Sequence, residues 1–530
     1  MSQPNLAILN ANVFTGSLER AEAVAIAGER IVAVGTSRDI ARFVGPHAEI
    51  IDAGGASLLP GFIDNHTHFM MGARQLLAVD LRTARSPGEF ADRIAERAVA
   101  LPAGRWLTGG NWDHEQWPHR TLPAKILIDP ITPSTPVFVT RLDLHMGLAN
   151  SAALALAGID RFTPDPPGGL IERNGDGEPT GILKDTAMDI VLGVIPKPGA
   201  DEEAVALKGA LAHAAALGIT SVQDVTSWDD WHTLQACHAR GELTLRLYAR
   251  TPIAQWREQL DWLAAHGPGD SWLRLGGVKG FVDGSLGSTT ALFLQPYSDA
   301  PDAHGLLIHP PEELAALITA ADAAELQLSI HAIGDAANHL LLDLYAAAAA
   351  KNGPRDRRAR IEHAQHLTPA DIRRFAALGV IASAQPYHAA DDGRWADRRL
   401  GAERVKMAYP FRSLLDAGAG LTFGTDWPVA PLDPLLGIHA AVTRQTLDGS
   451  HPDGWVPEQK ISLAEAIHAY TAASAFGEFA EQDKGRIAPG YLADLVLLDT
   501  DLFALPPADI AQARVACTVS GGKIIYRRPG

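Results

Sequence analysis

The sequence predicts a mixed α/β protein built on a (β/α)8 TIM barrel, with a composite β-sandwich domain from both chain termini and an insertion near the barrel mouth. Three observations lead to this fold class. The middle of the chain alternates short apolar strands with alanine-rich helical stretches, both ends carry short β-like segments, and the chain of 530 residues is several times longer than a usual domain.

The two ends of the chain have the pattern of small β-sheets, in which short apolar strands are separated by glycine and polar turns. Near the start, the expected strands cover residues 6–13, 23–27, 30–34 and 50–52. Near the end, they cover residues 495–498, 516–519 and, after the Gly521-Gly522 turn, 523–526. Because both ends share this pattern around a long middle, we expect residues 1–60 and 478–530 to form one composite β-sandwich domain.

Residues 61–477 have the alternating pattern that builds a parallel sheet. Apolar strands are expected to end at Ile63-Asp64, Val222-Gln223, Val278-Lys279, Ile330-His331, Ile361-Glu362, Ile381-Ala382 and Phe423-Gly424. Helices are expected between them, for example at residues 202–216, 311–324 and 369–378. So many βα units favour a closed barrel over an open doubly wound sheet, and no glycine-rich dinucleotide fingerprint follows the first strand.

One βα step is much longer than the others. Residues from about 75 to 200 are rich in proline, glycine and tryptophan and exceed the length of a single βα unit. We therefore expect these residues to form an insertion that caps the barrel mouth.

The composition excludes several classes of function. Hydrophobic residues make up 47% and charged residues 20% of the chain, as in an ordinary soluble globular protein. The formal net charge of -17 repels a phosphate backbone, and the one dense basic run, residues 355–360, has the pattern of a solvated surface. The expected partner is therefore a small-molecule substrate and not nucleic acid.

The sequence also indicates a reducing compartment and no membrane span. The two cysteines, Cys237 and Cys517, are too few for a secreted disulfide scaffold and suit the cytoplasm. The segment Met1-Ser2-Gln3-Pro4-Asn5 lacks the basic start and apolar run of a signal peptide. No stretch approaches the ~18 uninterrupted apolar residues that a membrane span needs.

The strand end Asp64-Asn65-His66-Thr67-His68 is the first candidate for chemistry. Alternate side chains of a strand face the same side, so Asp64, His66 and His68 share one face and the two imidazoles can bind one metal ion. His-x-His alone is weak support for a metal site. This one closes an apolar strand, however, and that edge is where the active sites of barrels lie.

Later strand ends carry polar residues where apolar ones would suffice, namely Lys279, His331, His363 and Asp426. Each alone has a structural explanation, such as a salt-bridged lysine, a hydrogen-bonded histidine or a turn aspartate. Their convergence with His66 and His68 on one rim instead favours a metal site. Imidazole and carboxylate ligands suit zinc, with manganese, iron and cobalt as alternatives.

A metal site of this kind activates water. A bound divalent ion lowers the pKa of its water to about 7, which makes hydroxide available at neutral pH. A neighbouring carboxylate can accept the proton and pass it to the leaving group, and Asp426, at the end of the last strand, is the candidate for this role. The sequence has no Gly-x-Ser-x-Gly elbow, and neither cysteine has a catalytic context.

Several longer motifs occur along the whole chain: Pro60-Gly61-Phe62-Ile63-Asp64-Asn65-His66-Thr67-His68, Asn111-Trp112-Asp113, Asp143-Leu144-His145 with Asn150-Ser151, Val278-Lys279-Gly280-Phe281-Val282-Asp283-Gly284-Ser285, His331-Ala332-Ile333-Gly334-Asp335, Ile361-Glu362-His363-Ala364-Gln365, Gly424-Thr425-Asp426-Trp427-Pro428, Gly485-Arg486-Ile487 and Gly490-Tyr491-Leu492-Ala493-Asp494-Leu495. Together they resemble the amidohydrolase superfamily. Within it, they are most similar to the amidohydrolase-3 branch, which contains YtcJ-like hydrolases and N-substituted formamide deformylase.

The resemblance implies a (β/α)8 barrel with a composite β-sandwich, commonly dimeric, and one or two metal ions. The implied ligands are His66, His68, Lys279, His331, His363 and Asp426. Lys279 would bridge as N6-carboxylysine, because a carbamate offers an oxygen ligand and an ammonium does not. Asp426 would also shuttle protons. His145 lies in a family motif and is expected to contact the substrate or transition state, with a structural histidine as the alternative.

The predicted function is hydrolysis of a non-peptide carbon–nitrogen bond of the amide or formamide type. Candidate pocket residues near the rim are Trp112, Gln385, Tyr387 and His388, although such aromatic residues are often only packing. Hydrolysis of an ester, lactone or carbamate is an alternative. Heterocycle deamination is another, disfavoured because Gly334 stands where deaminating relatives tend to carry a glutamate. A non-enzymatic scaffold is disfavoured because all six ligand candidates are present.

Overall fold

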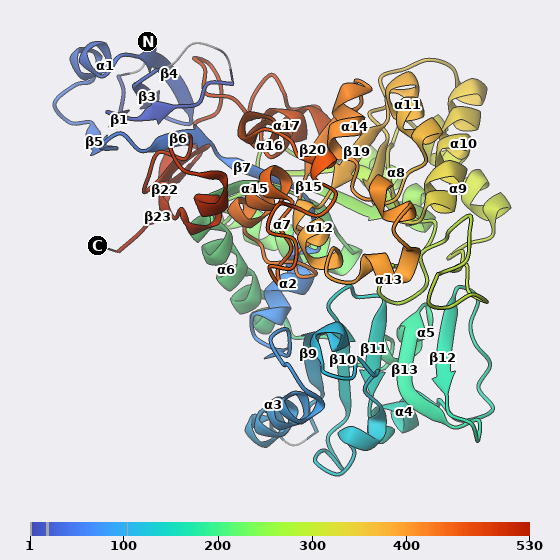
Figure 1. Cartoon of the computed structure of the whole chain (residues 1–530). Helices are drawn as coiled ribbons and strands as arrows, with labels where there is room; N and C mark the ends of the chain where they lie inside the picture. Colours follow the sequence, from blue (N-terminus) through green and yellow to red (C-terminus); the bar gives the residue numbers. More distant parts are fainter. Residues whose placement is uncertain (1–2, 17–20, 103, 530) are drawn as a thin grey trace.

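Eight parallel strands form the centre of the computed structural model, which describes residues 3–16, 21–102 and 104–529 (Figure 1). In pairing order, the strands are β7 (Phe62–Thr67), β14 (Ile219–Val225), β15 (Arg246–Pro252), β16 (Leu273–Phe281), β17 (Gln327–Ala332), β18 (Arg360–His363), β19 (Ile381–Ala384) and β20 (Gly420–Phe423). Met1 and Ser2, which begin the segment without signal-peptide features, lie outside the described residues.

The first and last strands of this sheet, β7 and β20, approach each other, so the sheet is a nearly closed barrel. At their carboxyl ends Thr67 forms a parallel bridge with Trp427, and the N–H of His68 donates to the carbonyl of Trp427 at 2.8 Å. Every residue of β7 is buried, as expected for a parallel strand that is covered on both faces. The predicted mixed α/β barrel is therefore confirmed at this level.

All seven strands predicted in the middle of the chain are present, and β15 is not among the predicted ones. Arg246 and Arg250 interrupt the apolar run of β15, so its sequence lacks the pattern of a buried strand. Both arginines are nevertheless buried, because each pairs with a buried carboxylate, Asp494 and Glu362 respectively.

Helices surround the barrel strands (Figure 1). They are α2 (Phe69–Gln75), α6 (Ala200–Ala216), α7 (Trp228–Ala239), α8 (Trp256–His266), α9 (Pro311–Ala323), α10 (Asp335–Asn352), α11 (Pro369–Leu378), α12 (Pro386–Asp392), α13 (Ala396–Leu400), α14 (Phe411–Asp416), α15 (Pro434–Thr443), α16 (Leu463–Ala469) and α17 (Ala472–Gly477). The predicted helices correspond to α6, α9 and α11. In α11 the Thr368 side chain accepts from the N–H of Asp371, and Gly379 ends the helix with a φ of 63°.

Two smaller sheets, on the left in Figure 1, contain the terminal segments of the chain. The first orders β4 (Arg30–Gly35), β3 (Ala23–Ala27), β1 (Leu6–Leu9) and β5 (Glu49–Asp52), with α1 (Ser37–Phe43) packed beside it. The second orders β2 (Asn12–Val13), β6 (Ser57–Pro60), β21 (Leu495–Leu498), β22 (Val515–Ser520) and β23 (Lys523–Arg527). One hydrophobic cluster joins the two sheets through residues such as Ile8, Val24, Leu58 and Leu497. The other terminal strands are as predicted, but residues 6–13, expected as one strand, form β1 and β2 in different sheets, because the chain turns at Asn10 with a φ of 54°. The single sandwich domain stays a prediction.

Between α2 and α6 the chain forms a further six-stranded sheet, drawn below the barrel in Figure 1. Its order is β12 (Gly169–Arg173), β13 (Pro179–Asp185), β11 (Met146–Ala149), β10 (Val137–Arg141), β9 (Leu107–Trp112) and β8 (Val79–Asp80), and its helices are α3 (Pro87–Ala100), α4 (Ser151–Leu156) and α5 (Ala187–Leu192). Phe90, Trp112 and Trp117 belong to a hydrophobic core of its own. We call residues 75–200 the insertion.

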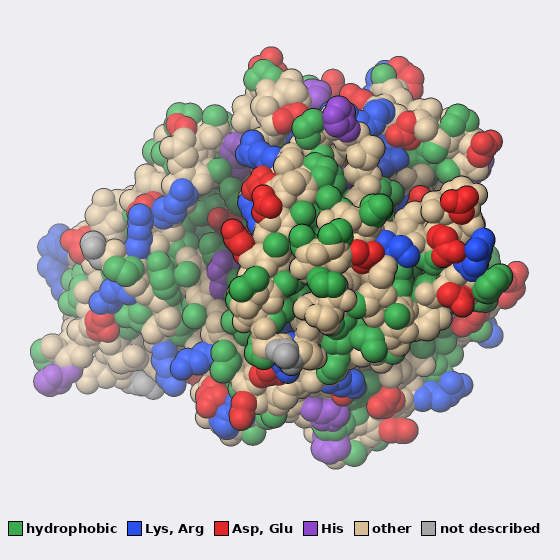
Figure 2. Space-filling view, turned by 90° about the horizontal axis from the view of Figure 1, so that it is seen from below, with side chains coloured by type: hydrophobic (Ala, Val, Ile, Leu, Met, Phe, Trp, Pro, Cys, Tyr) green, Lys and Arg blue, Asp and Glu red, His purple; other side chains and the backbone are tan. Residues whose placement is uncertain are grey.

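In the described part of the chain, no helix has the length and apolar character needed to cross a membrane. The face shown in Figure 2 intersperses acidic and basic side chains, and no basic stripe gathers on it. The face in view therefore has no basic patch that could bind a phosphate backbone, in keeping with the net charge of -17.

We predict that Asp494→Ala strongly destabilises the fold. Asp494 accepts from Arg246 Nε at 2.7 Å and from Nη2 at 3.2 Å, and the two side chains are only 4% and 2% exposed. Removing the carboxylate leaves a buried, unpaired guanidinium and should lower the free energy of unfolding by about 3–5 kcal/mol in chemical denaturation. As a control, Asp483→Ala removes the exposed partner of Arg30 and should cost at most about 1 kcal/mol. Equal losses in both variants would contradict this prediction.

Candidate metal centre

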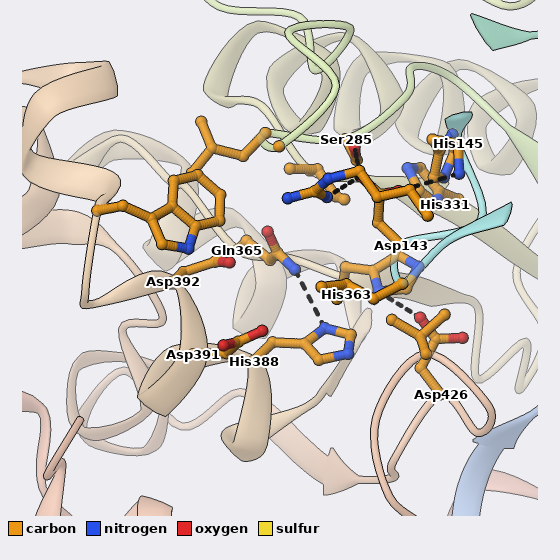
Figure 3. A pocket seen from close by; sticks show the side chains of 17 residues that line it. Asp143, His145, Ser285, His331, His363, Gln365, His388, Asp391, Asp392 and Asp426 are labelled. Atoms are coloured by element: carbon orange, nitrogen blue, oxygen red, sulfur yellow. Dashed lines mark hydrogen bonds and ion pairs between the residues drawn. The ribbon is translucent and has the colours of Figure 1, made fainter. Parts of the chain in front are cut away.

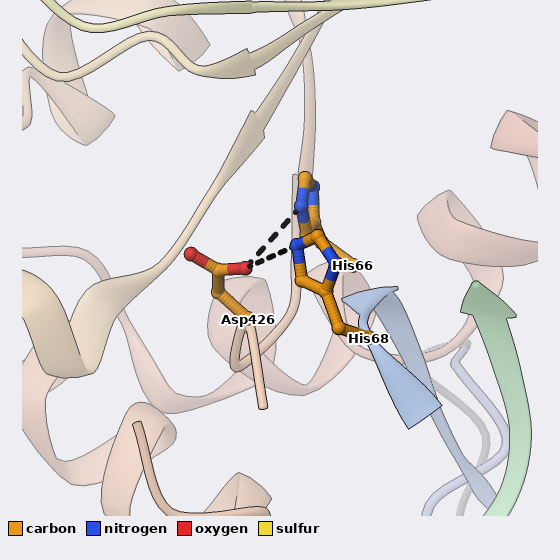
Figure 4. A group of neighbouring side chains, drawn as sticks. All are labelled: His66, His68 and Asp426. Carbon is orange, nitrogen blue, oxygen red and sulfur yellow. Dashed lines mark ion pairs between the residues drawn. The ribbon is translucent and has the colours of Figure 1, made fainter. Parts of the chain in front are cut away.

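Two histidines and one aspartate meet at the carboxyl ends of the first and last barrel strands (Figure 4). His66 Nε2 and His68 Nε2 each lie 3.4 Å from Asp426 Oδ1. His66 belongs to β7, His68 follows that strand, and Asp426 lies in the turn after β20. The alternation of side chains along β7 thus brings two imidazole nitrogens to one carboxylate oxygen.

The turn that presents Asp426 has a strained backbone. Asp426 has a φ of 61°, in the left-handed region that favours glycine, and its N–H donates to the carbonyl of His66 at 2.7 Å. Asp64 supports the turn by accepting from the N–H of Thr425 at 2.9 Å and from its hydroxyl at 2.5 Å. Strain of this kind costs about 1–3 kcal/mol and persists only where the surroundings fix the conformation. The direction of the Asp426 side chain is therefore set by the fold.

Hydrogen bonds decide which ring nitrogen carries the proton in three of the histidines. The bonded pairs are His66 Nδ1 with Glu362, His363 Nδ1 with Gln385 Oε1 (2.8 Å), and His331 Nε2 with the carbonyl of Gly284 (3.1 Å). Each partner is an acceptor, so the bonded nitrogen carries the proton and the other nitrogen keeps its lone pair. Three rings can therefore offer a lone pair to a metal ion, and the hydrogen bond at the other ring nitrogen orients each ring.

Glu362 is the buried carboxylate that orients His66. Besides His66, its contacts are Arg250 Nη1 (2.8 Å), Arg360 Nε (2.9 Å) and the hydroxyls of Ser329 and Ser383. Burial raises the pKa of the Glu362 carboxyl, but the two guanidinium groups outweigh this and hold it well below its usual range. Glu362 is therefore charged, and it keeps the proton of His66 on Nδ1.

Lys279 lies beside the same imidazole. Its Nζ is 3.2 Å from His66 Nε2, and the residue is 3% exposed. Burial lowers the pKa of Lys279 to about 8, although Glu362 and Asp426 raise it. Part of the amine is therefore uncharged near neutral pH, as a nucleophilic or carboxylated lysine requires.

Two overlapping groups of side chains have ligand atoms close enough for one ion. Within each group these atoms lie within 4.8 Å of one another, and the groups are His66, His68 and Asp426, and His363, His388 and Asp426. Among the described residues, Asp426 Oδ1 and His388 Nε2 are buried without a hydrogen-bond partner. Such atoms are costly without a cation, so the donor set fits a divalent metal. Lys279 lies beside the first group through its contact with His66. His331 belongs to neither group, whereas His388, predicted as a pocket residue, belongs to one.

The cluster opens into a pocket between the barrel and the insertion (Figure 3). Five of the predicted site residues line the pocket: His145, His331, His363, His388 and Asp426. Apolar surface comes from Leu142, Leu286, Ile333, Trp395 and Val429.

Three predicted pocket residues are not among the described residues that line the pocket. Trp112 is fully buried in the core of the insertion, where its Nε1 donates to the carbonyl of Val139 at 3.1 Å, so its expected position at the pocket is corrected. Its large ring packs in that core because an apolar cluster is available there. Gln385 is buried behind His363, and Tyr387 is half-buried on α12.

The insertion pairs His145, one of the pocket residues, with a second residue of its own. His145 precedes β11, Asp185 ends β13, and His145 Nδ1 lies 2.5 Å from Asp185 Oδ1. Burial lowers the pKa of His145, but the hydrogen bond to Asp185 and the charge of that carboxylate outweigh this, so the net shift is upward. His145 therefore favours the protonated form more than an ordinary histidine does.

Acidic and basic residues of the pocket wall neutralise one another. Arg141 donates to Asp143 at 2.6 Å, and Arg394 pairs with Asp391. Burial raises the pKa of Asp392 to about 7, although a hydrogen bond from Tyr409 lowers it. Because both guanidinium groups are already paired, neither offers a free anchor for an anionic substrate.

Sequence reasoning missed Glu362, Asp185 and Arg141. Glu362 had a signal, because a charged residue inside a short apolar strand needs a buried partner. Asp185 and Arg141 end two strands of the insertion and belong to no motif with a known chemistry. Only the pairing of the insertion strands brings Arg141 to the pocket and Asp185 to His145.

Comparison with known proteins gives one family. A model described as "Amidohydrolase family" matches residues 49–526. Protein LONG AFTER FAR-RED 3 of Arabidopsis thaliana is 40% identical, with coverage of 98% of this chain and 91% of that protein. Putative amidohydrolase YtcJ of Bacillus subtilis is 34% identical, with 96% and 97% covered, and N-substituted formamide deformylase of Arthrobacter pascens is 28% identical, with 99% of each covered. The solved structure of an uncharacterized metal-dependent hydrolase from Pyrococcus horikoshii is 30% identical with a TM-score of 0.75, covering 95% of this chain and 99% of that one.

We predict that Glu362→Gln lowers metal affinity about 10–100-fold. A neutral amide no longer fixes the proton on His66 Nδ1, and it leaves Arg250 and Arg360 without a counter-charge. Elemental analysis after dialysis against a series of zinc buffers measures the affinity. The exposed Glu258→Gln variant is the matched control and should retain metal as the wild type does. Unchanged affinity in Glu362→Gln would rule out the orienting role.

Proposed function

Because this chain belongs to the amidohydrolase family of metal-dependent hydrolases, we propose that it hydrolyses a non-peptide carbon–nitrogen bond in a small amide or formamide. The observation that supports this most is the buried cluster of His66, His68 and Asp426. The cluster opens into the pocket, and Asp426 Oδ1 has no hydrogen-bond partner among the described residues. A carboxylate in that state can both bind a metal and take up a proton.

The proposed metal is zinc, as one or two ions, because imidazole and carboxylate ligands suit it. The residues that would hold it are His66, His68, Lys279, His331, His363 and Asp426. When bound, the metal would polarise the scissile carbonyl and lower the pKa of the attacking water. We also propose that Lys279 is carboxylated, since its amine lies 3.2 Å from His66 Nε2, where an ammonium cannot act as a ligand.

The residues of the chain divide the remaining tasks. Asp426 takes a proton from the attacking water. Glu362 and Gln385 hold the His66 and His363 rings in place. His145 faces the substrate from the insertion, and the apolar lining excludes water from the bond that breaks.

The substrate class is proposed from the relatives and the pocket together. One relative is named N-substituted formamide deformylase, which favours a formamide or a similar small amide. Ester, lactone or carbamate hydrolysis is the second candidate, because it needs the same groups. Deamination is disfavoured, since a Cβ at Gly334 would clash with the carbonyl oxygen of Leu292 and leaves no room for a glutamate there. Retention of every ligand candidate argues against a non-enzymatic scaffold.

We propose that residues 1–60 and 478–530 form one composite β-sandwich domain, supported by their shared sheet and hydrophobic cluster. Residues 61–477 would form the metal-dependent barrel, capped by the insertion. A cytoplasmic location is proposed because Cys237 and Cys517 are both buried and unpaired. The homodimer that the resemblance implies stays a prediction.

We predict that Asp426→Asn lowers kcat/KM for N-substituted formamides by about 10²–10⁴-fold, because the amide side chain cannot accept the proton from water. Release of formate and amine by the zinc-loaded protein measures this. The exposed Asp416→Asn variant is the control and should match the wild type. Wild-type protein that is inert toward formamides, amides and anilides would overturn the proposed specificity, and activity toward esters or lactones would support the second candidate.

Metal content tests the role of Lys279 separately. We expect about two equivalents of metal in the wild type, as in a binuclear site, and one or none in Lys279→Ala. Elemental analysis of protein purified without chelators measures this, with the exposed Lys351→Ala variant as the control. One equivalent in all three proteins would indicate a mononuclear site and contradict a bridging lysine.

A further inference from the structure

We propose that the insertion supplies a proton-donating dyad, His145 and Asp185, which protonates the leaving nitrogen of the substrate. His145 is the group that meets the reacting atoms, and Asp185 is a positioning residue that acts through it. This inference rests on the proposed function, hydrolysis of a carbon–nitrogen bond, and adds a second proton-transfer group on the side of the pocket away from Asp426.

The side chain of Asp185 is committed to His145. Its Oδ1 lies 2.5 Å from His145 Nδ1, the side chain is 2% exposed, and its Oδ2 has no hydrogen-bond partner among the described residues. Burying a carboxylate with one unsatisfied oxygen is costly, and a purely structural aspartate would be expected to gain more partners. In this arrangement a carboxylate accepts the N–H of an imidazole and stabilises the imidazolium form.

The dyad leaves the second ring nitrogen of His145 available to the pocket. Nδ1 contacts Asp185, and the side chain of His145 is 16% exposed and lines the pocket. The backbone is fixed as well, because the N–H of Asp185 donates to the carbonyl of His145 at 3.0 Å. The N–H of His145 donates to Asp143 Oδ1 at 3.3 Å. Nε2 is therefore presented in a fixed direction.

Asp143 ties this segment of the insertion to the barrel. Its Oδ2 accepts from Arg141 at 2.6 Å, from Ser285 at 2.6 Å and from Ser288 at 3.0 Å. Ser285 and Ser288 lie in the loop after β16, the strand that carries Lys279. His145 is thus held relative to the metal centre by the barrel itself, which a group that transfers a proton requires.

Neighbouring imidazoles connect His145 to the residues around Asp426. Ring centres are 5.1 Å apart for His145 and His331, 4.4 Å for His331 and His363, and 5.0 Å for His363 and His66. Asp426 Oδ2 is 4.0 Å from His363 Nδ1, and Asp426 and His145 line the same pocket (Figure 3). An amide bound in this pocket would meet Asp426 on the side of its carbonyl carbon and His145 on the side of its nitrogen.

The two groups balance the protons of the reaction. Water adds to the carbonyl carbon and gives one proton to the Asp426 carboxylate. His145, as imidazolium, gives its Nε2 proton to the nitrogen as the carbon–nitrogen bond breaks, and that electron pair stays on the nitrogen. The products are a carboxylic acid and an amine. Exchange with solvent then returns Asp426 and His145 to their starting states, while Asp185 stays ionised throughout.

The test compares two probes that differ in how much their nitrogen needs a proton. N-Butylformamide releases a strongly basic amine, whereas 4-nitroformanilide releases a weakly basic aniline that departs with little protonation. In zinc-loaded Asp185→Asn we expect kcat/KM to fall about 100-fold or more for N-butylformamide and less than about 10-fold for 4-nitroformanilide. Asp185→Glu should recover part of the loss, and the metal content of both variants should equal that of the wild type.

Asp176→Asn, in the exposed turn between β12 and β13, is the matched control and should treat both probes as the wild type does. His145→Asn should repeat the leaving-group dependence of Asp185→Asn, and it decides the question if Asp185→Asn does not fold. Equal losses on both probes in the dyad variants would overturn this inference alone, because a structural or binding role does not depend on the leaving group. Wild-type protein inert toward both probes would overturn the proposed function and this inference with it.

Discussion

Inside the barrel, the carboxylate of Glu362 contacts Arg250, Arg360 and His66, and none of these side chains is exposed to solvent. Both guanidinium groups also donate to the carbonyl of Asn65 in β7, at 3.1 Å and 2.7 Å. The same charges therefore hold the first strand in the barrel and fix the proton of its histidine. Removing Glu362 would leave both guanidinium groups buried without a counter-charge, which makes the fold and the candidate metal centre depend on the same carboxylate.

The chemistry and the pocket come from different parts of the chain. The metal-ligand candidates lie at the carboxyl ends of barrel strands, where the strand geometry fixes them. The facing wall comes from the insertion, which adds Arg141, Asp143 and His145. Asp143 joins the two parts through Ser285 and Ser288. A barrel that keeps its metal centre can thus change substrates by changing the insertion.

Much of the fold could be predicted because buried parallel strands are apolar runs bounded by turns. β15 could not, since Arg246 and Arg250 look like surface residues until their partners Asp494 and Glu362 are known. The positions of residues at strand ends, such as His331, could be predicted because a barrel brings the carboxyl ends of its strands together on one rim.

The rest of the site depends on contacts between distant segments, which local pattern does not encode. His388 shares a candidate ligand group with His363, 25 positions earlier. Trp112 was misplaced because a tryptophan near a motif packs equally well in a core. Asp185 meets His145 only through the pairing of β11 with β13.

The most direct test of a metal centre at this rim is an anomalous diffraction map at the zinc edge from zinc-loaded crystals. A strong peak at about 2.0–2.2 Å from His66, His68 and Asp426 is the predicted result. Full-occupancy zinc found only at other residues, with this cluster free of metal, would contradict the account.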